Sequence, residues 1–88
     1  MHKEELILLH LVLARMKKVF EEAGFSNEYF YSYEELTVRP VKIHRSKAEH
    51  REAIVILCRG ILHVFEETPF EAILENPKLQ ESLLNLAH

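Results

Sequence analysis

The sequence predicts an all-α fold, a small helical bundle of four or five helices that forms one domain over residues 1–88. Apolar residues recur at helical spacing through two long segments, and no alternating strand pattern interrupts them. All 14 acidic residues are glutamates, which suit helix interiors better than aspartates because aspartate competes for backbone hydrogen bonds. Two domains cut from 88 residues would each be too small to bury an adequate core.

The first predicted helix spans residues 3–22, where no proline or glycine occurs. Leu8, Val12 and Val19 widen its apolar seam to nearly half of the helix circumference. One neighbouring helix cannot cover so wide a surface, which predicts a homodimer formed through this helix. A protein-binding adaptor that offers the same surface to a different chain is the alternative. The seam itself consists of Leu6, Leu9, Leu13, Met16 and Phe20.

An aromatic-rich, irregular connection is predicted after Gly24, which ends the first helix. Ser32 and Glu35 form a capping-box pattern that predicts a short helical turn ending near Leu36. Residues 37–43 contain Pro40 and are expected to be extended, because the residue before a proline avoids helical geometry.

A second capping box, Ser46 with Glu49, predicts the start of the other long helix. Its apolar face continues through Ala53, Ile54, Leu57, Ile61, Val64 and Phe65. Short helices are predicted to follow, one beginning with Pro69 at its first position and one opened by Asn76 and Pro77. The last of them carries Leu79, Leu83 and Leu86.

Positive charge is concentrated in residues 39–51, which sum to +4 because five cations face one glutamate, whereas the rest of the chain sums to −7. Helix N-termini present unpaired backbone N–H groups, so a basic segment there suits a phosphate or carboxylate. The segment predicts a site for an anionic macromolecule, RNA or a ribonucleoprotein such as the ribosome. The expected anion-binding residues are Arg39, Lys42, His44, Arg45, Ser46, Lys47 and Arg51.

Two alternatives to this interpretation stay open. The cations of residues 39–51 could instead pair with glutamates of the first helix or of a partner chain, since charge runs are commonly solvated faces. Tyr31 and Tyr33 could stack on exposed bases or belong to the core.

Histidines on apolar helix faces suggest a second kind of site. His50 lies in the middle of the apolar face of its helix, and His2 and Glu5 lie in the apolar arc of the first helix. If these ends meet, within a protomer with parallel long helices or across a dimer, they could ligate a divalent metal such as zinc. An ion pair from Glu5 to Lys47 or Arg51 is the alternative. The expected metal ligands are His2, Glu5, His10, His44 and His50, whereas His63 and His88 are expected to be exposed.

The sequence argues against an enzyme, a secreted protein and a membrane protein. With two glycines and no aspartate it offers no Gly-rich phosphate loop and no aspartate for a catalytic triad, and Cys58 falls on a buried arc. Ser46 and His50 resemble a nucleophile with its base, but Ser46 serves as a helix cap. Acids near the N-terminus do not fit a signal peptide, and the apolar stretches are too short to span a bilayer. A cytoplasmic protein is expected.

Two stretches resemble a small family of archaeal proteins of about this length, helical and without an assigned function. They are residues 1–6 with His10, and Pro40 followed by residues 44–54, and the resemblance covers the first helix and residues 40–57. It implies a helical fold and no reaction, although some family members carry a metal-binding label. The positions that it touches are His2, Glu5, His10, His44, Ser46, Lys47, Glu49 and His50.

Overall fold

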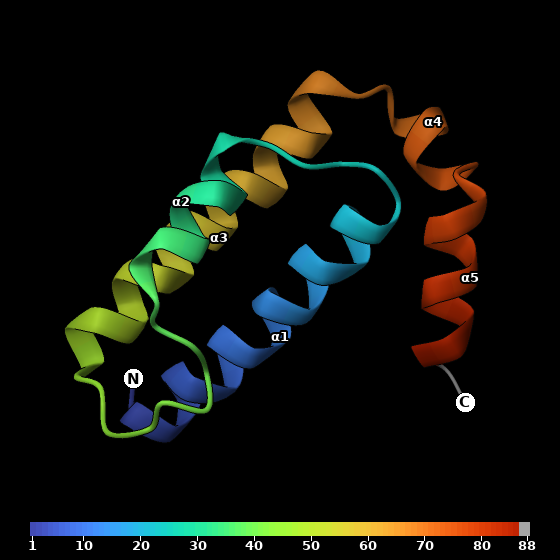
Figure 1. The fold of residues 1–88 in the computed structure, drawn as a ribbon. Helices are drawn as coiled ribbons and strands as arrows, with labels where there is room; N and C mark the ends of the chain where they lie inside the picture. The colour runs from blue at the N-terminus through green and yellow to red at the C-terminus, as the bar shows by residue number, and fades with distance from the viewer. Residues whose placement is uncertain (87–88) are drawn as a thin grey trace.

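A computed structural model describes residues 1–86, in which five α-helices and no strands occur, so the all-α prediction is confirmed. No helix in this range is long and apolar enough to cross a membrane. The helices are α1 (Lys3–Glu22), α2 (Glu28–Leu36), α3 (Lys47–Glu67), α4 (Phe70–Leu74) and α5 (Pro77–Leu86) (Figure 1).

The two long helices run in the same direction, and α2 returns in the opposite direction beside α3 (Figure 1). After α3 the chain turns through α4, and α5 packs against α1. The N-terminal ends of α1 and α3 therefore lie at the same end of the molecule, together with the loop of residues 37–46 that connects α2 to α3 (Figure 1).

The cap of α3 is the one that the sequence predicts. Ser46 Oγ accepts a hydrogen bond from the Glu49 backbone N–H at 3.1 Å, and the Glu49 carboxylate accepts one from the Ser46 N–H at 3.1 Å. Asn76 likewise caps α5 by accepting from the Leu79 N–H at 2.9 Å. Helix α4 begins at Phe70, so Pro69 lies at its cap rather than at its first helical position.

The prediction for α2 is wrong about where the helix begins. Asn27 Oδ1 accepts hydrogen bonds from the N–H groups of Tyr29 and Phe30, so the helix starts at Glu28 and Ser32 lies in its interior. The loop of residues 37–46 also differs from the extended course that was expected for residues 37–43. Its backbone folds into turns closed by the Lys42 N–H on the Arg39 carbonyl at 2.9 Å and the Arg45 N–H on the Lys42 carbonyl at 3.0 Å.

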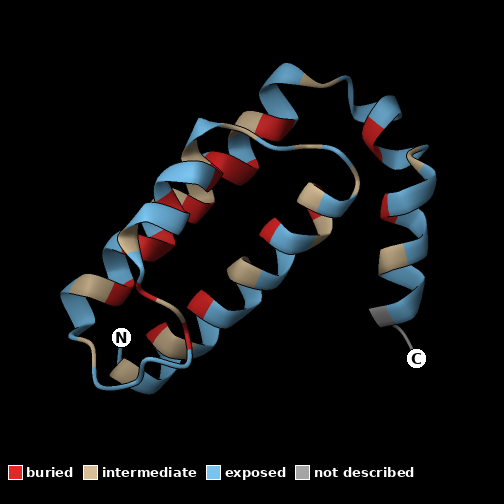
Figure 2. Cartoon of the chain, in the orientation of Figure 1, coloured by how far each residue is buried: buried red, intermediate tan, exposed pale blue. Residues whose placement is uncertain are grey.

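The core lies between α1, α2 and α3, with α4 and α5 closing one end (Figure 2). Phe30 of α2 is fully buried, and its ring occupies the space over Gly60 of α3 where a Cβ atom would otherwise stand. One cluster of buried residues consists of Phe20, Phe30, Ile61, Val64, Ile73 and Leu79, and the other of Tyr33, Val38, Ala53 and Leu57.

The buried face of α1 differs from the predicted seam. Leu6 and Phe20 are buried, but Leu9 and Met16 are each 37% exposed, whereas His10 and Lys17 are buried. The helix is rotated relative to the apolar pattern because α2 and α3 supply polar partners for His10 and Lys17. An apolar strip of α1 consequently faces outward.

Candidate functional site

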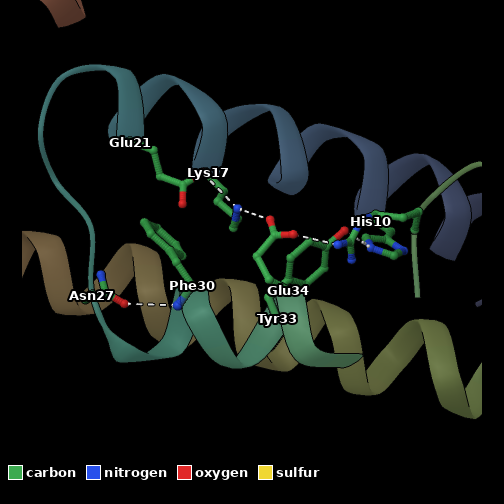
Figure 3. A network of polar contacts seen from close by, with 8 residues as sticks. His10, Lys17, Glu21, Asn27, Phe30, Tyr33 and Glu34 are labelled. Atoms are coloured by element: carbon green, nitrogen blue, oxygen red, sulfur yellow. Dashed lines mark hydrogen bonds and ion pairs between the residues drawn. The ribbon is translucent and has the colours of Figure 1, made fainter. Parts of the chain in front are cut away.

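A chain of hydrogen bonds crosses the interior between the three main helices. His10 of α1 is within hydrogen-bond distance of the Tyr33 hydroxyl of α2 through Nε2 (2.8 Å) and of His50 of α3 through Nδ1 (2.9 Å between the two Nδ1 atoms). His50 Nε2 lies 3.0 Å from the backbone oxygen of Lys42 in the connecting loop. Figure 3 shows His10 and Tyr33 pointing toward each other across the helix interface.

The donor and the acceptor in each of these hydrogen bonds follow from the last acceptor of the series, the Lys42 backbone oxygen. A backbone oxygen can only accept, so His50 donates from Nε2 to Lys42. With both rings neutral, His50 Nδ1 must then accept from His10 Nδ1, and His10 Nε2 must accept from the Tyr33 hydroxyl. One arrangement of protons therefore satisfies every hydrogen bond in the series. The series links the loop at Lys42 to the interior of the bundle.

Both ends of the His10–Tyr33 hydrogen bond are held neutral. Burial, followed by electrostatic interactions with His50 and Arg39, lowers the pKa of His10 to about 4. Burial also raises the pKa of the Tyr33 hydroxyl. Near neutral pH, His10 therefore stays an acceptor at Nε2 and Tyr33 stays a donor.

A second polar cluster lies farther along α1. Lys17 Nζ donates to Glu21 at 2.8 Å and to Glu34 of α2 at 2.5 Å, and Glu34 also accepts from Arg39 at 2.6 Å (Figure 3 shows the lysine and the two glutamates). Although burial alone would lower it, the pKa of Lys17 is raised by hydrogen bonds to the two carboxylates. The bond from Lys17 in turn lowers the pKa of Glu34. Tyr33 is buried under Arg39, whose guanidinium lies 5.1 Å from the ring centroid, so stacking of Tyr33 on a base is excluded in this conformation.

The predicted anion-binding residues divide into two groups. Arg39 pairs with Glu34, Arg45 pairs with Glu49 at 2.9 Å, and Ser46 is occupied as the cap of α3. The remaining members of the set are exposed, and none of them forms an ion pair among residues 1–86. These members are Lys42, His44, Lys47 and Arg51.

The predicted metal ligands do not assemble within one chain. His10 and His50 meet, but His2 and Glu5 are exposed at the start of α1, where the Glu5 carboxylate accepts from the His2 backbone N–H at 2.8 Å. His44 is exposed in the loop. Residues 1–86 contain no group of three or more histidine, cysteine or carboxylate side chains placed to hold a metal ion. The five residues therefore do not come together within one protomer of this structure, and metal binding stays a prediction.

The register of the parallel helices explains this outcome. His10 lies beside His50, three residues into α3 but seven residues into α1, so the first turns of α1 extend past the start of α3. The alternative ion pair from Glu5 to Lys47 or Arg51 does not form within one protomer among the described residues.

Two minor predictions on individual residues also differ from the structure. His63 is half-buried with its ring edge-on to Tyr29, rather than exposed, and His88 lies outside the described residues. Cys58 is half-buried. Both ring nitrogens of His50 are engaged by His10 and Lys42, so His50 does not serve Ser46 as a base.

Comparison with known proteins identifies the family. The model of the uncharacterised protein family UPF0058 matches residues 1–87. The chain belongs to this family. A UPF0058 protein of Archaeoglobus fulgidus is 49% identical over 87 residues, covering 99% of this chain and 94% of its own, and one of Methanocaldococcus jannaschii is 37% identical, covering 98% and 77%. The crystal structure of Vng1086c from Halobacterium salinarium matches with a TM-score of 0.65 at 31% identity, covering 99% of this chain and 96% of that chain.

Sequence reasoning missed the roles of two residues of this UPF0058 chain. Tyr33 is the hydrogen-bond partner of His10, and Arg59 belongs to the exposed basic side of α3. Tyr33 stands 23 residues from His10, and no spacing rule connects positions so far apart on different helices. Arg59 was detectable, because it lies at helical spacing from Lys47 and Arg51, on the same exposed side of α3. Together with Arg51 it lines a shallow hollow of about 490 Å³.

Proposed function

We propose that the protein is a non-enzymatic binding module that attaches to RNA through a basic surface on the loop and on the outer side of α3. The observation that carries this proposal is the separation of the cations into paired and free groups. Arg39 and Arg45 are neutralised by neighbouring glutamates, whereas the basic residues of this surface are exposed and form no ion pair among residues 1–86. The basic surface consists of Lys42, His44, Lys47, Arg51 and Arg59.

The spacing of the basic surface suits a phosphate backbone. Lys47, Arg51 and Arg59 are separated by multiples of four residues, so they form a row about 18 Å long at roughly 1.5 Å per residue that winds about a third of the way round the helix. Phosphates neutralised by such a row release counterions, which supplies most of the sequence-independent affinity for nucleic acids. One acid, Glu52, shares the hollow with the two arginines.

The loop end of the surface is held in place before any partner binds. His50 donates to the Lys42 backbone oxygen at 3.0 Å, and Val38 and Pro40 are buried. Ion pairs at Arg39 and Arg45 secure the loop on both sides. A surface that is ordered in the free protein loses little conformational entropy on binding, which favours affinity.

Binding of a fluorescent single-stranded RNA, followed by anisotropy over a series of salt concentrations, tests the proposal. Lys47→Gln with Arg51→Gln removes two phosphate contacts, so the slope of log K against log salt should fall in magnitude by about 1.4, at roughly 0.7 per contact. The matched control is Lys18→Gln with Lys78→Gln, which changes net charge equally at exposed lysines elsewhere and should keep the wild-type slope.

Equal slopes for the two double variants would refute the assignment of the surface. Absence of salt-sensitive binding by the wild type would refute RNA binding itself. Pull-down of ribosomal particles from cell extract, with and without nuclease treatment, then shows whether retained material depends on RNA.

A further inference from the structure

An apolar groove lies on the side of the molecule away from the loop, between α1 and the α4–α5 segment. Its volume is about 510 Å³, and it is lined by side chains from four helices. One wall is the outward strip of α1, with Val12, Met16 and Val19, and the other carries Phe70, Leu74 and Leu83. The only charged residue in its lining within residues 1–86 is Arg15.

Large apolar side chains on both walls of the groove are exposed to water. Leu8, Val12 and Met16 are 61%, 48% and 37% exposed, and Phe70, Leu74 and Leu83 of the opposite wall are each more than half exposed. A standard stable interface buries about 800 Å² per partner. That is roughly a seventh of the 5929 Å² surface of this chain.

We propose that a second copy of this chain occupies the groove, with the outward strip of α1 of each copy packed into the groove of the other. The strip lines the groove of its own copy, and it is also an amphipathic helix face that can pack into the groove of the second copy. The same contact can therefore form twice, once from each copy, which gives a closed twofold dimer. This interface is separate from the basic surface, and the RNA proposal does not depend on it.

Charge at the rim fits the same occupant. Arg15 forms no ion pair with a residue in the described range. The α4–α5 segment exposes Glu71, Glu75 and Glu81 against Lys78 alone. A second copy therefore supplies acidic side chains to the rim where Arg15 lies, which a purely apolar ligand would not do.

Light scattering after size exclusion tests the dimer. The wild type should have twice the 10.4 kDa chain mass, and its melting temperature should rise with protein concentration because association stabilises the folded chain. Val12→Glu and Leu83→Glu place a charge in the contact on exposed side chains and should each give a monomer with an unchanged far-UV circular dichroism spectrum. The matched control is Val55→Glu, which changes a valine of similar exposure on the outer side of α3 and should remain dimeric.

A wild-type monomer at concentrations up to about 100 μM, well above a micromolar dissociation constant, would overturn the proposal. A dimer that persists in both groove variants would also overturn it, because association would then use another face. A monomer that binds an added amphipathic peptide, and loses it in Val12→Glu, would assign the groove to a different chain.

Discussion

The buried His10 couples the stability of the fold to pH. Its pKa is lowered to about 4 in the folded chain, mainly by burial, against 6.5 for the free side chain. The unfolded chain therefore binds more protons between these values, so the contribution of His10 is complete above pH 6.5 and is lost as the pH falls toward 4. A shift of this size corresponds to about 3 kcal/mol of unfolding free energy at pH 7 relative to pH 4.

Urea unfolding of the wild type and of His10→Gln from pH 7 to pH 4.5 measures this contribution. The pKa of Glu34 is lowered from 4.5, so its own titration lies at or below the bottom of this range and adds little to the difference. The wild-type free energy should fall more steeply with decreasing pH than that of the variant. Parallel profiles would show that His10 does not carry the titration.

At the residue scale, the sequence located His50 correctly and misjudged its partners. His50 stands in the middle of an apolar helix face, and a histidine there must point inward. That His10 and Tyr33 complete its hydrogen bonds depends on the rotation of α1 and on the register of three helices, and neither quantity is local. Lys17 was missed for the same reason, because its burial depends on Glu34 from another helix.

At the element scale, the contact between α2 and α3 is governed by Gly60. A Cβ atom at this position would overlap the ring of Phe30, which is fully buried. Asn27 reinforces the same contact by donating to the Gly60 backbone oxygen at 3.0 Å. Gly60→Ala should therefore destabilise the fold by about 1 to 3 kcal/mol from overpacking, even though alanine has the higher helix propensity.

Thermal unfolding of the wild type, Phe30→Leu, Gly60→Ala and Gly60→Ala/Phe30→Leu separates these two effects. The smaller side chain of the double variant makes room for the added methyl group, so alanine should cost less there than in the single variant. A single variant as stable as the wild type would mean that the ring yields at little cost.

Helix bounds were predictable where a cap and an uninterrupted apolar pattern coincide. An uninterrupted apolar pattern ends at Gly24 in α1 and begins at the Ser46 cap in α3, and the bounds of both helices match the expected positions. For α2 the capping-box pattern at Ser32 competed with the stronger cap Asn27, whose side chain accepts two backbone hydrogen bonds. The turns of residues 37–46 depend on tertiary anchors at Arg39 and Lys42 that local propensity does not contain.

At the scale of the whole molecule, α4 and α5 complete the core of the three main helices rather than forming a separate unit. Ile73 and Leu79 belong to the same buried cluster as Phe20 and Phe30. We expect a single cooperative unfolding transition, and Ile73→Ala should lower the free energy of unfolding by about 2 to 5 kcal/mol without splitting it.

Two probes report on this cooperativity. All three tyrosines lie in α2, whereas circular dichroism reports on every helix. Coincident denaturation curves from tyrosine fluorescence and circular dichroism would support one unit. An early loss of helical signal without a change in fluorescence would instead show that α4 and α5 unfold on their own.

The parallel course of α1 and α3 gives the molecule a strong electric dipole despite its small net charge of −3. The peptide dipoles of two helices of 20 and 21 residues add, and the helices that run against them, α2 with 9 residues and α5 with 10, are much shorter (Figure 1). Side-chain charges increase this dipole. Lys42 and Lys47 lie near the N-terminal, positive ends of the two helices, and acidic pairs that include Glu22 and Glu67 lie at their C-terminal, negative ends. The electric field of a polyanion would orient such a molecule before contact, so that the end bearing the loop approaches the polyanion first.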